Sequence, residues 1–213
     1  MRLIKFALSR SFQFSPFLLL LLTLGCAEKL SASDEESAPV LDPNGPKVET
    51  LEDRNGVRTT LVNAESTEQW VYFNLDGAME VQPDNPTDDL TWDIAFQRFK
   101  IKSNGGISGT GEVEIARLSG ADYTELTAAP LDGYQVDEED SEDQDSDPDY
   151  VFLGEDPWYE YDLQSHILSP ADFIYVIRSV DGGYFKFQML DYYDEAGTSG
   201  YPLFQWGIVN APE

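Results

Sequence analysis

The sequence has 213 residues, with 40 Asp or Glu, 13 Lys or Arg, one histidine and one cysteine, and its formal net charge is −27. This acidity excludes a nucleic-acid partner, because a strongly negative protein repels the phosphate backbone. The single cysteine excludes an intramolecular disulfide, so packing alone must stabilise the fold. No nucleophile motif accompanies the single histidine, and we therefore do not expect an enzyme.

The first 25 residues have the pattern of a signal peptide. Basic residues precede an apolar run at residues 17–24, which is too short for an ordinary membrane-spanning helix. Gly25 then precedes Cys26 as in a bacterial lipobox, although Thr23 stands where Leu is favoured. We therefore predict cleavage before Cys26 and acylation of its thiol, for example by palmitate, which would anchor the chain in a lipid bilayer. An ordinary secretory signal with an incidental cysteine is the alternative.

Residues 26–47 are predicted to form the acylated residue and a disordered tether, because they are rich in Ser, Glu, Asp, Ala and Pro. Ala27 and Glu28 follow the cysteine in place of the Asp that often retains lipoproteins at the inner membrane. We therefore expect the outer membrane, on its periplasmic or cell-surface face. Cleavage removes three of the 13 basic residues and none of the 40 acidic ones, so the mature chain would carry a net charge of −30.

Residues 48–213 are predicted to form one mainly β domain, an antiparallel two-sheet sandwich or a curled sheet with little helix. Apolar residues in this part of the chain alternate with polar ones, and helical spacing is weak throughout. Alternation in the second expected strand places Leu90, Trp92, Ile94 and Phe96 on one face. The expected strands are residues 70–75, 90–96, 111–117, 173–178, 184–190 and 201–206.

Short polar segments between these runs predict how the strands are connected. Asp181-Gly182-Gly183 separates two aromatic and β-branched runs, which is a strong signal for a β-hairpin. Pro202 should lie on an edge strand or at a strand start, because proline donates no ladder hydrogen bond. Residues 119–126 are the best candidate for a short turn or helix.

Residues 137–149 interrupt the β pattern, since nine of these 13 residues are Asp or Glu. We expect a solvated loop, because a core does not accept so many charges. Alternating carboxylates in the loop could supply oxygen ligands to calcium, although the order of residues in an EF-hand is absent. A flexible acidic insertion without calcium is the alternative. The candidate calcium ligands are Asp143, Asp145, Asp147 and Asp149.

Five short motifs occur in a fixed order along the predicted domain. They are Trp92-Asp-Ile-Ala-Phe-Gln-Arg98, Ile101-Lys-Ser-Asn-Gly-Gly106, Tyr175-Val-Ile-Arg178, Asp181-Gly-Gly-Tyr-Phe-Lys186 and Tyr192-Tyr193. Together they resemble the HmuY family of haem-binding outer-membrane lipoproteins, over about residues 70–206. The resemblance implies an antiparallel β fold with a haem site in loops at one end of the sheets. It also implies two axial ligands, His or Met, and delivery of captured haem to an outer-membrane receptor.

The histidine and two methionines are the candidate iron ligands that this resemblance selects. His166, the only histidine, lies between two predicted strands, where a neutral imidazole could bind haem iron or could simply be exposed. Met79 follows Asp76-Gly77-Ala78 in an expected loop and could reach a ligand. Met189 alternates with aromatic residues in a strand and fits a core-filling role better. A tyrosine or water could also supply the sixth ligand.

Aromatic and basic side chains could complete a porphyrin site. Tyr159, Tyr161, Tyr192 and Tyr193 could stack on the ring or could face outward from strands. Arg98, Lys100, Lys102, Arg178 and Lys186 could pair with propionates or with acidic residues across a strand pair. The negative charge of the chain opposes binding of a dianionic porphyrin unless a basic side chain such as Arg98 lines the pocket. The alternative function is a surface structural or adhesion lipoprotein of the same fold without haem.

Overall fold

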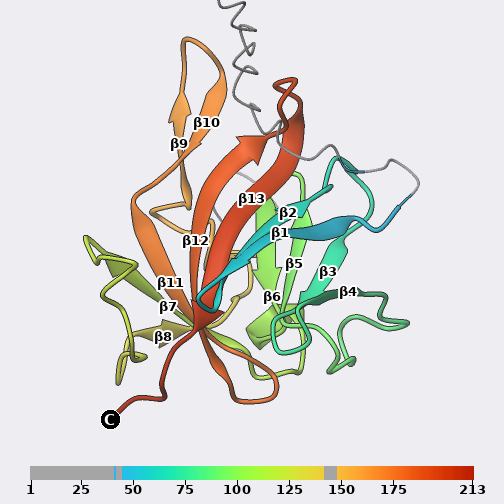
Figure 1. Ribbon diagram of the computed structural model, residues 1–213. Helices are drawn as coiled ribbons and strands as arrows, with labels where there is room; N and C mark the ends of the chain where they lie inside the picture. Colours follow the sequence, from blue (N-terminus) through green and yellow to red (C-terminus); the bar gives the residue numbers. More distant parts are fainter. Residues whose placement is uncertain (1–40, 42–44, 142–147) are drawn as a thin grey trace, which may run out of the picture. The chain divides into compact units, whose positions relative to one another are not determined.

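The computed structural model of the protein describes residue 41 and residues 45–141 and 148–213 (Figure 1). The signal peptide, Cys26 and most of the predicted tether therefore lie outside the described residues. In this part of the chain the one helical segment is a 3-10 turn, η1, at Gly106–Ser108. No helix among the described residues is long and apolar enough to cross a membrane. The prediction of a mainly β, antiparallel fold is confirmed.

The larger sheet has seven antiparallel strands in the order β1-β2-β13-β12-β11-β7-β8. A second sheet has four strands in the order β4-β3-β5-β6, and β9 and β10 form a separate two-stranded hairpin. The strands of the larger sheet are β1 (Val48–Arg54), β2 (Val57–Val62), β7 (Glu114–Ser119), β8 (Tyr134–Gln135), β11 (Phe173–Arg178), β12 (Tyr184–Tyr193) and β13 (Ser199–Ile208). The others are β3 (Val71–Asn74), β4 (Met79–Val81), β5 (Ile94–Gln97), β6 (Lys100–Ser103), β9 (Tyr159–Asp162) and β10 (Ile167–Pro170).

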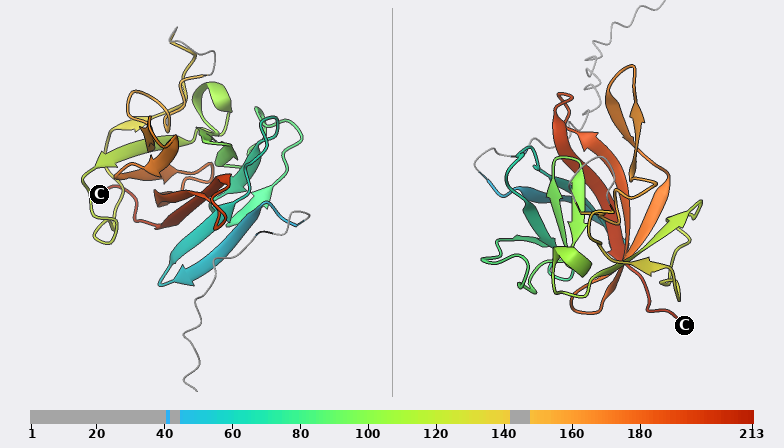
Figure 2. Two further views of the ribbon diagram at one scale, coloured as in Figure 1. Left: turned by 90° about the horizontal axis from the view of Figure 1, so that it is seen from above. Right: turned by 180° about the vertical axis from the view of Figure 1, so that it is seen from behind.

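Aromatic side chains join the two larger sheets, which Figure 2 shows from above and from behind. Phe96 of β5 stacks on Phe204 of β13, with 5.3 Å between the ring centroids. Phe73 of β3 meets Trp206 of β13 edge to face at 5.5 Å. Alternate residues of each strand point to the same face, so these rings fill the space between the sheets. The predicted sandwich therefore has an aromatic core.

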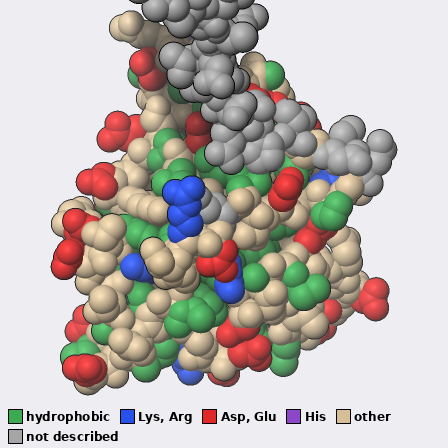
Figure 3. All heavy atoms as spheres, in the orientation of Figure 1, with side chains coloured by type: hydrophobic (Ala, Val, Ile, Leu, Met, Phe, Trp, Pro, Cys, Tyr) green, Lys and Arg blue, Asp and Glu red, His purple; other side chains and the backbone are tan. Residues whose placement is uncertain are grey.

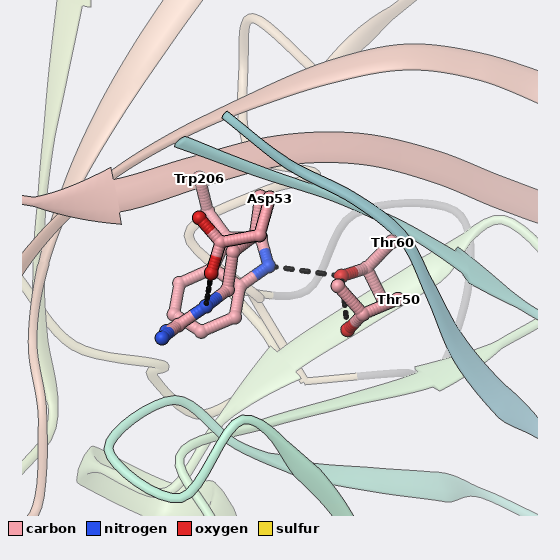
Figure 4. A network of polar contacts seen from close by, with 5 residues as sticks. Thr50, Asp53, Thr60 and Trp206 are labelled. Atoms are coloured by element: carbon pink, nitrogen blue, oxygen red, sulfur yellow. Dashed lines mark hydrogen bonds and ion pairs between the residues drawn. The ribbon is translucent and has the colours of Figure 1, made fainter. Parts of the chain in front are cut away.

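A polar network closes the outer part of this core at β1, β2 and β13 (Figure 4). The buried Trp206 indole N–H donates to Thr60 Oγ1 at 2.9 Å, and Thr50 Oγ1 lies 3.3 Å from the same hydroxyl. Arg58 covers the outer side of the indole ring at 4.9 Å and pairs with Asp53 at 3.2 Å. The indole N–H is therefore satisfied without water, as a buried donor requires.

Two predicted strands have different boundaries or surroundings in the structure. β5 begins at Ile94, and Leu90 is 55% exposed, so Leu90 does not share the buried face of Trp92, Ile94 and Phe96. Pro202 lies inside β13, which is an interior strand. Proline, which has no N–H to donate, is tolerated there because the pairing of β13 with β2 begins only at Leu203. The pairing of β13 with β12 is also irregular between Ser199 and Leu203.

The predicted β11–β12 hairpin is confirmed, with Gly182 at a positive φ of 80° in its turn. The β1–β2 hairpin was not predicted, although Asn55-Gly56 carries the signal for it. Both turn residues have positive φ, 55° and 80°. Residues 119–126 contain a turn at residues 123–125 and no helix.

Asp137 is buried, so the expectation that residues 137–149 are solvated throughout was wrong for this residue. Its side chain is 1% exposed. Its carboxylate accepts hydrogen bonds from the backbone N–H groups of Ser103 at 2.8 Å and Val151 at 3.0 Å. These donors replace water, although burial still raises the pKa of Asp137. One charge of the acidic segment therefore anchors the segment to the sandwich.

Candidate functional site

The β9–β10 hairpin extends beside the ends of β12 and β13 (Figure 1) and carries the only histidine. Its turn, residues 163–166, is held by Asp162, whose carboxylate accepts from the N–H groups of Gln164 at 2.7 Å and Ser165 at 3.2 Å. The Asp162 carbonyl accepts from the N–H of His166 at 2.8 Å. His166 has a φ of 59°, which is the left-handed region. The turn thereby fixes the backbone from which the imidazole projects.

The imidazole of His166 lies against the phenol of Tyr161 on the same hairpin. The Tyr161 hydroxyl oxygen lies 2.5 Å from His166 Nδ1, which is hydrogen-bond distance. Both side chains are exposed. Because Nδ1 is engaged, Nε2 is the ring nitrogen of His166 that remains for a ligand.

This pair forms one rim of a pocket of about 380 Å³ between the hairpin, β12 and the turn after β5. Tyr193 ties the pocket to the hairpin, because its hydroxyl accepts from the N–H of Leu168 at 2.9 Å. Burial raises the pKa of both Tyr159 and Tyr192, so these phenols are uncharged at neutral pH. The lining residues are Arg98, Phe99, Tyr159, Tyr161, His166, Leu168, Tyr192, Tyr193 and Ser199.

Buried aromatic contacts hold the walls of this pocket in place. Phe99 meets Tyr159 edge to face at 5.9 Å, and its carbonyl accepts from the Trp158 indole at 2.9 Å. Trp158 in turn packs against Tyr192 at 5.9 Å. Three separate segments of the chain are thus fixed relative to one another. The pocket has preformed, mostly aromatic walls, which is typical of small-molecule sites.

Arg98 supplies the positive charge of the pocket. Its guanidinium donates to the carbonyls of Glu65 at 3.2 Å and Ser199 at 3.1 Å, and to the Ser199 hydroxyl at 2.7 Å. In the described part of the chain, no carboxylate forms an ion pair with it. No acid among the described residues therefore neutralises this positive charge, and the guanidinium can interact with an anionic ligand.

The sequence matches a family described as HmuY protein over residues 66–206, about two thirds of the chain. The chain belongs to the HmuY family. The predicted resemblance is confirmed, and the match includes β3 to β12 and most of β13.

Solved structures related to the HmuY family share this fold at low sequence identity. The apo HmuY analogue of Tannerella forsythia has a TM-score of 0.56 and 16% identity, covering 72% of this chain and 95% of its own. A candidate HmuY-like heme-binding protein of Bacteroides vulgatus has a TM-score of 0.53 and 15% identity, and the match covers 74% of this chain and 95% of that protein. A candidate lipoprotein of Bacteroides fragilis has a TM-score of 0.51 and 20% identity, and the match covers 74% of this chain and 91% of that protein. A search of curated proteins found no match.

The other basic side chains considered for a HmuY-type site do not line this pocket. Lys102 lies over aromatic rings, 4.6 Å from the centroid of Trp70. Arg178 pairs at 3.0 Å with Glu114 on the neighbouring strand, as the cross-strand alternative proposed. Lys186 is buried and donates to backbone carbonyls at 2.7 and 3.1 Å. Lys100, in β6, is also absent from the pocket lining.

Neither candidate methionine lines the pocket. Met189 is 4% exposed and belongs to the core cluster, because it alternates with Phe187 on the inner face of β12. Met79 is 55% exposed and is the first residue of β4 rather than a loop residue. The structure thus brings His166 and the four tyrosines together. It does not bring a methionine to them.

Only part of the predicted calcium site can be located. Asp143, Asp145 and Asp147 lie outside the described residues. Asp149 pairs with Glu138 through two backbone hydrogen bonds, of 3.0 and 3.1 Å. Within residues 45–141 and 148–213, no group of three or more His, Cys, Asp or Glu could hold a metal ion. Calcium binding remains a prediction without structural support.

Phe99, Leu168 and Ser199 were not predicted as pocket residues. Each becomes part of the site through tertiary structure: Phe99 through the turn after β5, Leu168 through the hairpin register, and Ser199 through its bonds to Arg98. The sequence signals for this surface were the single histidine, the four tyrosines and Arg98, which ends one of the family motifs.

Proposed function

We propose that this protein binds haem, or a related iron porphyrin, in the pocket between the β9–β10 hairpin and β12. The observation that carries the proposal is the gathering of the only imidazole, four tyrosines and one uncompensated guanidinium around one cavity. Membership of the HmuY family supports it, and so does the Bacteroides vulgatus relative described as a candidate heme-binding protein.

The lining residues match the chemistry of an iron porphyrin. Its flat apolar ring suits the aromatic walls, and its carboxylates suit Arg98. The volume of about 380 Å³ falls within the range of about 300–1,000 Å³ that is usual for small-molecule sites. When bound, the iron would accept a lone pair from a protein donor.

His166 is the proposed iron ligand, through Nε2. A neutral imidazole binds iron without first losing a proton, and the Tyr161 contact already fixes the other ring nitrogen. No methionine is among the described residues that line the pocket. We therefore propose that His166 would bind the iron and that water or a tyrosine would supply any further donor.

We further propose that Cys26 is acylated and anchors the domain at the outer membrane, where the protein would deliver haem to a receptor. The lipobox-like Gly25-Cys26 and the Bacteroides fragilis relative described as a candidate lipoprotein support the anchor. A Cys26→Ser protein should leave the membrane fraction, and mass spectrometry should find lipid on Cys26 of the wild type. Unmodified Cys26 would reject the anchor.

A visible absorption titration of the purified protein with haemin tests haem binding. We expect a red-shifted, saturable Soret band in the wild type. His166→Ala should shift this band and weaken binding by about 10-fold or more, because the axial donor is lost. Gln164→Ala, an exposed change in the same turn, should bind as the wild type does. No Soret shift in the wild type would favour the alternative of a surface lipoprotein without haem.

A further inference from the structure

We infer that Tyr161 is the positioning residue for His166: its phenol oxygen accepts the Nδ1 hydrogen and so leaves Nε2 with the lone pair that binds iron. This inference rests on the haem-binding function proposed above. It assigns a role to the 2.5 Å contact between the Tyr161 hydroxyl and His166 Nδ1. A histidine that binds a metal almost always donates its other N–H to an oxygen, which fixes the tautomer and raises the basicity of the ring.

The hairpin register brings the two side chains together. Tyr161 pairs with Leu168 in the ladder, and His166 directly precedes β10. His166 has a φ of 59°, a left-handed conformation that has an energetic cost for a residue with a side chain. Three hydrogen bonds to Asp162 hold the turn against this cost. The turn thereby holds the imidazole in hydrogen-bond contact with the phenol.

The other tyrosines of the pocket do not offer this contact. The Tyr193 hydroxyl accepts from the N–H of Leu168, which fixes β10 rather than the imidazole. Tyr159 and Tyr192 take part in aromatic packing with Phe99 and Trp158. In the described part of the chain, no carboxylate forms an ion pair with His166. Tyr161 is therefore the acceptor that the structure provides for Nδ1.

A competing assignment would make the phenol oxygen of Tyr161 the iron ligand and His166 the acceptor of its proton. A neutral imidazole already carries the lone pair that binds a metal, whereas a phenol must first lose its proton. The variants Tyr161→Phe and His166→Ala distinguish the two assignments, because each removes one of the two possible donors.

Haemin binding to Tyr161→Phe tests the inference, with Tyr184→Phe as the matched control, because Tyr184 in β12 does not line the pocket. We expect Tyr161→Phe to keep the electron paramagnetic resonance signature of imidazole-ligated ferric haem. Its affinity for haemin should fall about 10- to 100-fold, as is usual when such a partner is removed. Its midpoint potential should become more positive, because a less basic imidazole stabilises ferric iron less. Tyr184→Phe should change neither the affinity nor the potential.

Three other outcomes would overturn the inference. Equal affinity and potential in Tyr161→Phe and the wild type would overturn the inference, since the phenol would then act only in packing. Loss of the axial ligand in Tyr161→Phe but not in His166→Ala would also overturn it, in favour of phenolate ligation. A wild type that binds no haemin would reject the proposed function and this inference together. Tyr161 is 47% exposed, so Phe there should not disturb folding; circular dichroism would verify this.

Discussion

At the scale of single residues, Arg98 resolves the conflict between a very acidic chain and an anionic ligand. Its guanidinium is held by carbonyl and hydroxyl oxygens, with donor–acceptor distances of 2.7 to 3.2 Å, so the group is oriented without losing its charge to an acid. A local positive charge outweighs distant negative ones, because salt screens exposed charges beyond about 8–10 Å. The acidic surface and an anion-binding pocket are therefore compatible.

We predict that Arg98→Gln weakens haemin binding about 10-fold or more, because a hydrogen bond to a charged group contributes about 1.5–3 kcal/mol. The measurement is an absorption titration with haemin and with its dimethyl ester, which lacks the propionate charges. The wild type should prefer haemin to the ester, and the variant should lose that preference. Equal losses for both ligands would mean that Arg98 acts only on the shape of the pocket, through Ser199.

At the scale of elements, the alternating pattern predicted β3, β5, β7, β11, β12 and β13, and β11 has the predicted boundaries, 173–178. The inner strand β2 was not predicted. The β9–β10 hairpin was not predicted. Its strands are four residues each and mostly exposed, and its turn contains His166 where Gly or Asn would have given a signal. The pairing of Tyr161 with His166 depends on that register. Local sequence therefore identified the site's histidine and tyrosines without showing that they meet.

Turn chemistry at the β11–β12 hairpin gives a prediction about stability. Gly182 has a φ of 80° and donates its N–H to the Ser179 carbonyl at 2.9 Å. Gly182→Ala should lower the free energy of unfolding by about 1–2 kcal/mol, since the left-handed conformation strains a residue with a Cβ. Gly154→Ala, where no atom lies within 4 Å of the added carbon and φ is not positive, should be neutral. Urea unfolding measures both, and equal effects would contradict the argument.

At the scale of the whole molecule, negative charge dominates the surface and two acids are buried beneath it. Figure 3 shows acidic side chains spread over the face drawn there rather than gathered in one patch. Asp93 is fully buried and accepts from the N–H groups of Leu75 at 2.7 Å and Val180 at 2.8 Å. It thus joins the end of β3 to the β11–β12 turn. Burial raises the pKa of Asp93 to about 6, and these two N–H donors only partly oppose the shift.

This raised pKa predicts how stability depends on pH. In the unfolded chain an Asp carboxyl has a pKa of about 3.9, so between about pH 4 and 6 the folded state binds more protons. Stability should therefore fall as the pH rises through that window, by about 3 kcal/mol from Asp93 alone. Urea unfolding at pH 4 and pH 7 should show a smaller decrease in the free energy of unfolding for Asp93→Asn than for the wild type. Asp132→Asn, an exposed change that does not act on Asp93, should keep the wild-type difference; an unchanged fall in Asp93→Asn would contradict this explanation.

The central claim is that haem binds between the β9–β10 hairpin and β12, and nuclear magnetic resonance tests its location directly. In ¹H–¹⁵N spectra of the protein titrated with haemin, the paramagnetic iron should first broaden the amide signals of Phe99, Tyr161, Leu168 and Tyr193. The signals of Asp181–Gly183, at the other end of the domain (Figure 1), should persist. Broadening centred on that opposite turn, or on Met79 in β4, would contradict the proposed site.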